Sequence, residues 1–208
     1  STFSDQEKIK VFGAGRTDTG VHALSQVAHF DLNTDLDTCN LIKALNAHLS
    51  EDILVESLDV VPADFHARYS AKKRYYRYQC YTGNNVLFRN QSWITGQLDQ
   101  SILQSVAETV VGEHDFLSFC KFRIDIKSTV CKIYESVWKK QGKMLIYYVS
   151  GNRFLHHMVR YLTGTMVEIS RRRFTIESFL NLLNNPEKNV QIFKAPPQGL
   201  ILEKVDYA

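Results

Sequence analysis

The stretch that decides the fold runs from Thr129 to Ser150 and reads TVCKIYESVWKKQGKMLIYYVS. Both of its halves are rich in β-branched and aromatic residues, which favour strands. Gln141-Gly142-Lys143 supplies a turn between them, because glycine adopts backbone angles that other residues avoid. The stretch therefore predicts a β-hairpin, with strands over 129–139 and 144–150.

Other strands and helices surround this hairpin without a regular alternation. The Tyr-rich segment 73–82 predicts a further strand, and 9–12, 24–32, 53–60 and 199–205 read as extended. Apolar residues at helical spacing predict helices over 35–49, 98–111, 154–169 and 175–184, the first of them capped by Asp37 or Thr38. This order favours an α+β fold with a largely antiparallel sheet.

Composition sets the remaining limits. The chain has 208 residues, of which 44% are hydrophobic and 23% charged, so it can bury a core without disulfides or metals. No apolar run approaches the ~20 residues that cross a bilayer, and the polar start is unlike a signal peptide. We expect a cytoplasmic protein with an N-terminal sub-domain over 1–66, which carries the Gly-rich loop, and a C-terminal one over 67–208.

The first segment whose residues could take part in catalysis or binding is the Gly-rich loop Gly13–His22, GAGRTDTGVH. Its glycines let the backbone come close to a ligand, and it presents the carboxylate of Asp18 beside the guanidinium of Arg16. An aspartate here is also typical of a plain turn. Asp18-Thr19-Gly20 matches the tripeptide of aspartic proteases, but those enzymes need two such aspartates sharing a proton, whereas this chain has a single copy and Arg16 favours the ionised form.

Two further segments are candidates. On the strand after Lys72, alternation places Arg74, Tyr76 and Tyr78 on one face, which suits base stacking but equally fits a half-buried strand. The predicted helix from Phe154 is mostly apolar, so its Arg160 must pair with another group or reach a solvent-filled cleft. On that helix the adjacent His156 and His157 would point to different faces, so a two-histidine metal site is not expected.

Taken together and in order, these segments resemble the tRNA pseudouridine synthase A family. The matching segments are Gly15–Ala23 (GRTDTGVHA), Asp64–Arg68 (DFHAR), Arg74–Tyr78 (RYYRY), His114–Phe116, Phe154–Arg160 (FLHHMVR) and Ala195–Leu200 (APPQGL). The resemblance extends from Val11 to Tyr207. The family begins with a further strand before the Gly-rich loop, and we expect that strand to be missing here.

The resemblance implies two ferredoxin-like sub-domains flanking a basic cleft, a homodimer that binds tRNA, and neither cofactor nor metal. The implied reaction converts uridine to pseudouridine at positions 38, 39 or 40, in the anticodon stem-loop. A rival expectation is a catalytically silent RNA-binding protein of the same fold.

Residue roles follow from the same resemblance. Asp18 corresponds to the catalytic aspartate, Tyr76 to the tyrosine stacked on the target uracil, and Arg160 to the basic partner of the aspartate. Arg16 corresponds to the residue that fills the space of the flipped base. The matched segments also make His22, Arg68 and Arg74 candidate substrate-binding residues.

Overall fold

The computed structural model describes residues 8–84 and 86–208, which fall into two compact units. The first contains residues 8–14 and Val27–Ser70, and the second contains Gly15–Gln26 and Ala71–Ala208. The Gly-rich loop from Gly15 onward, with Asp18, therefore groups with the second unit. The division expected at residues 66 and 67 stays a prediction, and it differs from these units in where it puts this loop. Among the helices of the described chain, none has both the length and the apolar character needed to cross a bilayer.

The first unit contains a two-stranded sheet and one helix. Strand β1 (Phe12–Gly13) pairs antiparallel with β3 (Ala28–His29). Helix α1 (Thr38–His48) is capped by Asp37, whose carboxylate accepts the Asn40 N–H at 2.7 Å, as one of the two predicted caps.

The extended segment predicted over 53–60 forms no strand in the structure. The backbone N–H and carbonyl of Val55 instead bond the side chain of Asn46, at 2.8 and 2.9 Å. The strand expected over 24–32 is likewise reduced to the two residues of β3.

The second unit contains a seven-stranded sheet of order β2-β9-β4-β8-β7-β6, with β5 also paired to β4. The strands are β2 (His22–Ala23), β4 (Lys73–Tyr81), β5 (Trp93–Ile94), β6 (Gly112–Asp115), β7 (Val130–Gln141), β8 (Met144–Gly151) and β9 (Leu200–Asp206). β2 runs parallel to β9 and β5 parallel to β4, while all other pairs are antiparallel. The β7–β8 hairpin is confirmed, with Gly142 at φ 60° in its turn. The chain is α+β with a largely antiparallel main sheet.

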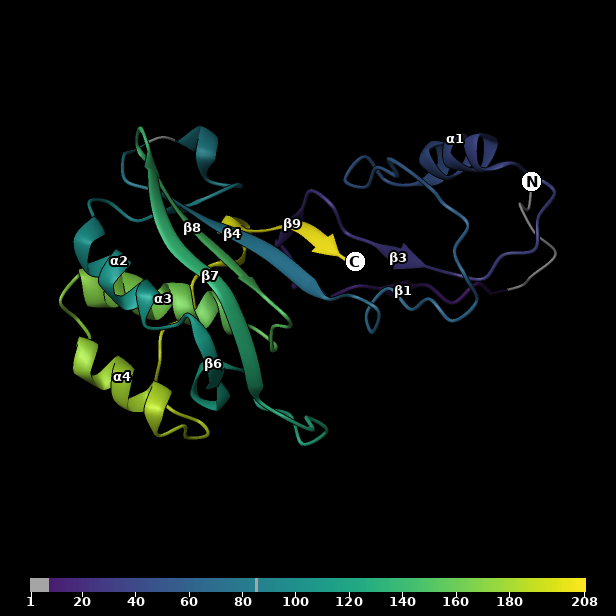
Figure 1. Cartoon of the computed structure of the whole chain (residues 1–208). Helices are drawn as coiled ribbons and strands as arrows, with labels where there is room; N and C mark the ends of the chain where they lie inside the picture. Colours follow the sequence, from purple (N-terminus) through teal and green to yellow (C-terminus); the bar gives the residue numbers. More distant parts are fainter. Residues whose placement is uncertain (1–7, 85) are drawn as a thin grey trace. The chain divides into compact units, whose positions relative to one another are not determined.

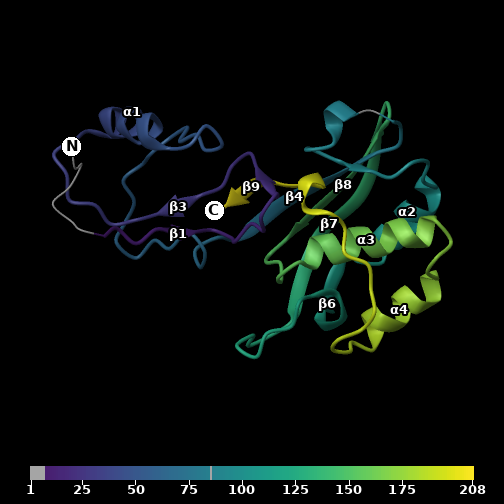
Figure 2. The same ribbon diagram turned by 180° about the vertical axis from the view of Figure 1, so that it is seen from behind.

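Helices cover one face of this sheet (Figures 1 and 2). Helix α2 (Gln100–Glu108) packs on β7 and on α3 (Met158–Ser170), and α4 (Ile176–Asn184) lies beside β6. Short 3₁₀ turns in the described part of the chain are η1 (Val86–Phe88), η2 (Leu117–Phe119) and η3 (Pro197–Gly199). Tyr78, Tyr147, Phe119, Met158 and Leu162 are fully buried between helices and sheet. This core holds α3 against the strands.

Helix α3 also packs unusually closely on the segment before β9. The Ala195 N–H donates to the carbonyl of Arg160 at 3.0 Å. A Cβ added at Gly164 would lie 2.7 Å from the Ala195 nitrogen and closer still to the Phe193 carbonyl oxygen. Only glycine leaves room for this approach, so Gly164 sets how near the 193–195 backbone comes to α3.

Replacing Gly164 by alanine should destabilise the second unit. The new methyl group meets backbone atoms that cannot move aside without disturbing the segment 193–195, so we expect a loss of about 1–3 kcal/mol in the free energy of unfolding. Urea denaturation measures it. Ile124→Ala, at a side chain that is 98% exposed, is the control and should stay within about 0.5 kcal/mol of wild type. Equal stability of Gly164→Ala and wild type would contradict this packing argument.

Candidate active site

The loop that carries Asp18 is held at both ends. At one end the Gln26 side chain donates to the carbonyl of Gly15 at 3.1 Å, and at the other β2 pairs with β9. Within the loop the Val21 N–H donates to the backbone carbonyl of Asp18 at 3.0 Å, and Gly20 has a positive φ of 83°. Because the backbone of Asp18 closes this turn, its carboxylate is left for other partners. The plain turn-forming role considered for this side chain is therefore not what the structure shows.

The carboxylate of Asp18 is bound by Arg160 from α3. Arg160 Nη1 donates to Asp18 Oδ2 at 2.5 Å, while Arg160 Nε donates to the carbonyl of Ala195 at 2.8 Å. Arg160 is buried, whereas about a quarter of the Asp18 side chain is exposed, at 24%. The expectation that this arginine needs a partner is confirmed, since one acid and one backbone carbonyl fix its guanidinium.

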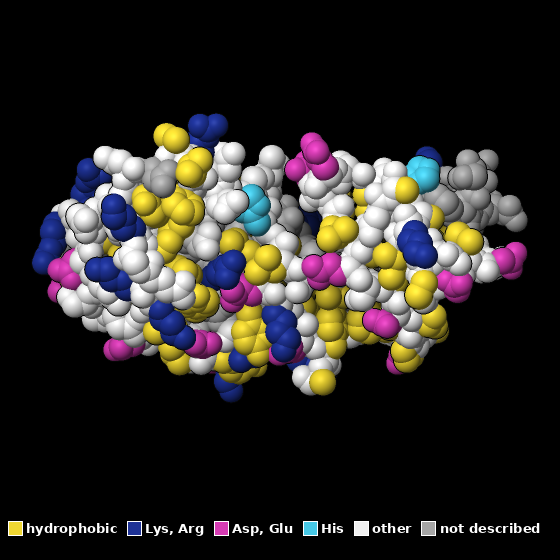
Figure 3. Space-filling view, turned by 90° about the horizontal axis from the view of Figure 1, so that it is seen from above, with side chains coloured by type: hydrophobic (Ala, Val, Ile, Leu, Met, Phe, Trp, Pro, Cys, Tyr) yellow, Lys and Arg dark blue, Asp and Glu magenta, His cyan; other side chains and the backbone are white. Residues whose placement is uncertain are grey.

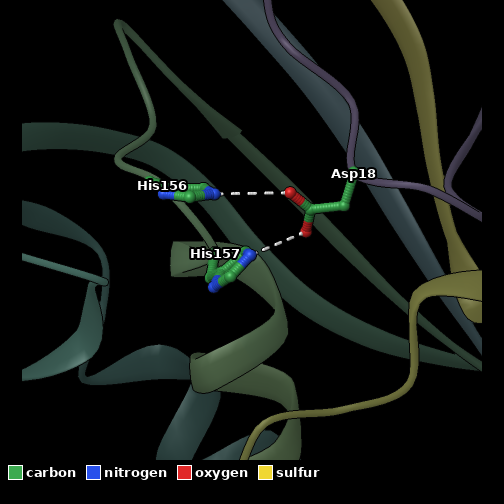
Figure 4. Close-up of side chains that lie close together, drawn as sticks. All are labelled: Asp18, His156 and His157. Atoms are coloured by element: carbon green, nitrogen blue, oxygen red, sulfur yellow. Dashed lines mark ion pairs between the residues drawn. The ribbon is translucent and has the colours of Figure 1, made fainter.

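Two adjacent histidines complete the surroundings of Asp18 (Figure 4). His156 Nε2 lies 3.5 Å from Oδ1, and His157 Nε2 lies 3.1 Å from Oδ2. The prediction that these two side chains point to different faces is wrong. Helix α3 begins only at Met158, and His157 has a left-handed backbone with φ 64°, so helical spacing does not apply to either histidine. Their rings lie 3.9 Å apart, centroid to centroid.

Electrostatics around the carboxylate favour its ionised form. Partial burial raises the pKa of Asp18, but the hydrogen bond from Arg160 and the positive charges nearby outweigh burial and hold the pKa below its usual value. Burial lowers the pKa of His157 to about 4, although the charge of Asp18 acts in the opposite direction. At neutral pH His157 is therefore uncharged, and Arg160 supplies the permanent positive charge at the acid.

Tyr76 on β4 lies against the Gly-rich loop. A Cβ built on Gly15 would be 3.7 Å from the Tyr76 hydroxyl, so the phenol lies close against that glycine. Burial raises the pKa of Tyr76 to about 12, with the nearby Asp18 adding to the rise. The ring packs edge-on against Phe154, with centroids 5.1 Å apart. The hydroxyl is thus a neutral phenol at physiological pH.

The other predicted site residues lie in different surroundings. Arg16 is exposed in the same loop as Asp18, and His22 Nε2 lies 2.7 Å from the carbonyl of Asn90. Arg74 is buried and donates to the carbonyl of Asn152 at 2.9 Å. Arg68 belongs to the first unit, exposed, with its guanidinium 5.8 Å from the centre of the Tyr69 ring. The structure thus brings together Asp18, Tyr76 and Arg160.

Sequence reasoning missed both histidines as neighbours of the acid. The signal in the sequence was the histidine pair itself, three to four residues before Arg160, but helical spacing predicts that the two rings point apart.

Basic side chains form no single patch on the face of the molecule drawn in Figure 3. There the Lys and Arg side chains are interspersed with apolar and uncharged ones.

A metal ion has three candidate ligands here. Asp18, His156 and His157 each offer one ligand atom, and these atoms lie within 4.8 Å of one another. The Arg160 guanidinium is bonded to Oδ2 and places a permanent positive charge beside one of these ligand atoms, which opposes metal binding. The expectation of a metal-free site stays a prediction.

Comparisons with known proteins agree on one family. A family model described as tRNA pseudouridine synthase matches residues 1–70 and 106–208. The chain is similar to the tRNA pseudouridine synthase A of Dictyoglomus turgidum, with 40% identity over 211 residues, 99% of this chain and 86% of that protein. It is also similar to the protein of that name from Chlorobium limicola, with 39% identity over 203 residues, 97% of this chain and 84% of that protein. The aspartic-protease reading of Asp18-Thr19-Gly20 is excluded, because the matched region includes this tripeptide.

The titration of His157 should affect stability in a defined pH window. Its folded pKa of about 4 lies below the ordinary 6.5, so between these values the unfolded chain holds a proton that the folded chain lacks. Stability must then fall as pH drops from 6.5 towards 4. His157→Gln, which does not titrate, should lose less stability than wild type over this window when urea midpoints are compared.

His114→Gln is the matched control, because this histidine lies outside the site and its Nε2 contacts only the Val111 carbonyl at 3.2 Å among the hydrogen bonds found in the described residues. An identical pH dependence of wild type and His157→Gln would show that His157 titrates normally.

Proposed function

Because the chain belongs to the tRNA pseudouridine synthase family, we propose that it isomerises uridine to pseudouridine in tRNA, with Asp18 as the catalytic residue. The observation that carries this assignment is the Asp18 carboxylate, held ionised by Arg160 in the loop whose sequence resembles the family signature. The relatives named above carry the same activity in their names.

The reaction itself explains why an ionised carboxylate is needed. The bond from ribose C1′ to uracil N1 breaks, the ring turns, and C1′ joins C5; N1 gains a proton and C5 loses one. No electrons are exchanged with another molecule. Asp18 can attack C1′, attack the uracil ring, or remove a proton from C2′, and each route requires the negatively charged form. The lowered pKa of Asp18 supports all three.

Arg160 serves this chemistry mainly by positioning the acid. Two unit charges ~4 Å apart attract by about 4 kcal/mol at an effective dielectric of 20, but desolvation of both groups offsets much of that. What remains is geometric, since Arg160 is tied to the Ala195 carbonyl and directs its Nη1 at Oδ2. The acid is thereby fixed before substrate arrives.

Tyr76 is proposed to stack on the extruded uracil, and Arg16 to fill the space that the base leaves in the stem. Pulling a base out of a stem costs a few kcal/mol, and one aromatic stack returns roughly 1–3 kcal/mol. Tyr76 lies beside the loop of Asp18, and Arg16 is exposed on that loop, where it can fill the space the base leaves. The neutral Tyr76 hydroxyl is the candidate to assist proton removal from C5.

The finer assignments follow from the family resemblance of the sequence. We propose that the target uridines lie at positions 38 to 40, that the enzyme is a cytoplasmic homodimer, and that its sub-domains are ferredoxin-like. His22 and Arg68, both exposed, are proposed contacts to the tRNA backbone. Arg74 is proposed to support substrate binding indirectly, because its guanidinium holds the backbone carbonyl of Asn152.

Asp18→Asn should abolish pseudouridine formation while leaving tRNA binding within a few-fold of wild type. The amide keeps the shape but removes the negative charge, so we expect a loss of roughly 10³-fold or more in rate. Tritium release from tRNA labelled at uridine C5 measures turnover, and filter binding measures affinity. Substantial turnover by Asp18→Asn would remove Asp18 from the mechanism. Binding without turnover by wild type would establish the silent RNA-binding alternative.

Tyr76→Phe should separate stacking from proton transfer. The phenyl ring keeps the stack, so KM for tRNA should hardly change, while kcat should fall by roughly 10²-fold if the hydroxyl assists proton removal. Tyr76→Leu is the companion variant and should also raise KM, because an aliphatic side chain does not stack on a base. An unchanged kcat in Tyr76→Phe would assign the residue to stacking alone.

A further inference from the structure

The backbone at His157 is held in a conformation that a residue with a side chain rarely adopts. Its φ of 64° lies in the left-handed region, directly before helix α3. Such a conformation costs free energy and persists only where the surroundings determine it. Its effect here is specific: it turns the imidazole towards Asp18, beside the ring of His156 (Figure 4).

The two nitrogens of His157 have different environments. Nε2 lies 3.1 Å from Asp18 Oδ2, and Asp18 is the nearest charged group to it. Nδ1 is buried and has no hydrogen-bond partner among the described residues. A proton on Nδ1 would be buried without an acceptor, whereas a proton on Nε2 faces a carboxylate oxygen. The environment therefore favours the neutral tautomer with its hydrogen on Nε2.

The two oxygens of Asp18 also differ. Oδ2 is approached by both Arg160 Nη1, at 2.5 Å, and His157 Nε2, at 3.1 Å. Oδ1 has the longer contact, 3.5 Å from Nε2 of His156, whose side chain is 38% exposed. Two nitrogens close to one oxygen restrict the rotation of the carboxylate, and they leave Oδ1 as the oxygen more available to react.

We propose that His157 is a positioning residue, which in its neutral Nε2–H form holds Asp18 Oδ2 together with Arg160 and so presents Oδ1 to the substrate. This inference rests on the proposed function of Asp18. A neutral donor suits the task, because it orients the carboxylate without adding the second full positive charge that would further stabilise the unreacted anion. His157 itself need not touch the nucleotide.

Two substitutions at this position isolate the donor. His157→Gln places an amide N–H four bonds from Cα, the same separation as imidazole Nε2. His157→Asn is one bond too short to reach Oδ2, but asparagine tolerates the left-handed backbone well. His114→Gln, outside the site, controls for the loss of a histidine.

We expect His157→Asn to lower kcat by about tenfold or more with KM for tRNA within about twofold of wild type, since a misdirected acid affects the chemical step more than binding. His157→Gln should restore kcat to within a few-fold of wild type. A wild-type kcat in His157→Asn would overturn the proposal. Equal loss in both variants, in parallel with their thermal stability, would also overturn it, because it would show a purely structural role.

A spectroscopic test does not depend on turnover. ¹⁵N NMR of the histidine side chains at neutral pH should show His157 as the neutral Nε2–H tautomer, with its signals shifted in Asp18→Asn. An Nδ1–H tautomer or an imidazolium would overturn the proposal even if the enzyme is active. A wild-type protein that makes no pseudouridine would instead refute the proposed function, and the tautomer would still be measured.

Discussion

The contact between Arg160 and the carboxylate of Asp18 is the constraint on which the rest of the second unit's site depends. It joins a loop near the start of the chain to a helix 142 positions later, so no local preference can produce it. Removing either partner would leave the other charge partly buried and unpaired. The free-energy cost of such a charge is larger than the cost of replacing the whole pair by apolar residues. The loop conformation, the start of α3 and the anchoring of Arg160 by Ala195 all have to agree for this one contact to form.

Backbone geometry, more than side-chain chemistry, sets the positions of these groups. Gly164 lets the 193–195 segment approach α3 closely enough for the Ala195 carbonyl to receive Arg160 Nε. At the N-terminal end of the same helix, the left-handed His157 precedes Met158 and brings two imidazoles to one side of the acid. An ordinary helical residue at 157 would extend α3 and separate the rings, and the imidazole of residue 157 would no longer lie beside Asp18.

Much of this could be predicted from local patterns. The β7–β8 hairpin follows from strand-forming residues on each side of Gly142, and α1 follows from its apolar spacing and the Asp37 cap. Arg160 was expected to need a partner because a buried guanidinium is costly alone. These features are decided within about 20 residues of sequence, where periodicity and capping act directly.

The rest depends on contacts that no short window contains. Residues 53–60 have the composition of a strand but pair with no strand among residues 8–84 and 86–208, and Val55 bonds the Asn46 side chain instead. The pairing of β2 with β9 could not be read from two residues, and it is what groups residues 15–26 with the second unit. Helical spacing does not predict the histidine pair, because α3 begins only at Met158, after both histidines.

The short closed loop around Asp18 has a consequence for how tightly a substrate can be held. Its two ends are fixed, by the Gln26 side chain on Gly15 and by the pairing of His22 and Ala23 with β9. A segment this restrained has little conformational entropy left to lose when a ligand arrives. Preorganisation of this kind lets the affinity gained from each new contact go into recognition, instead of being spent on ordering the catalytic loop.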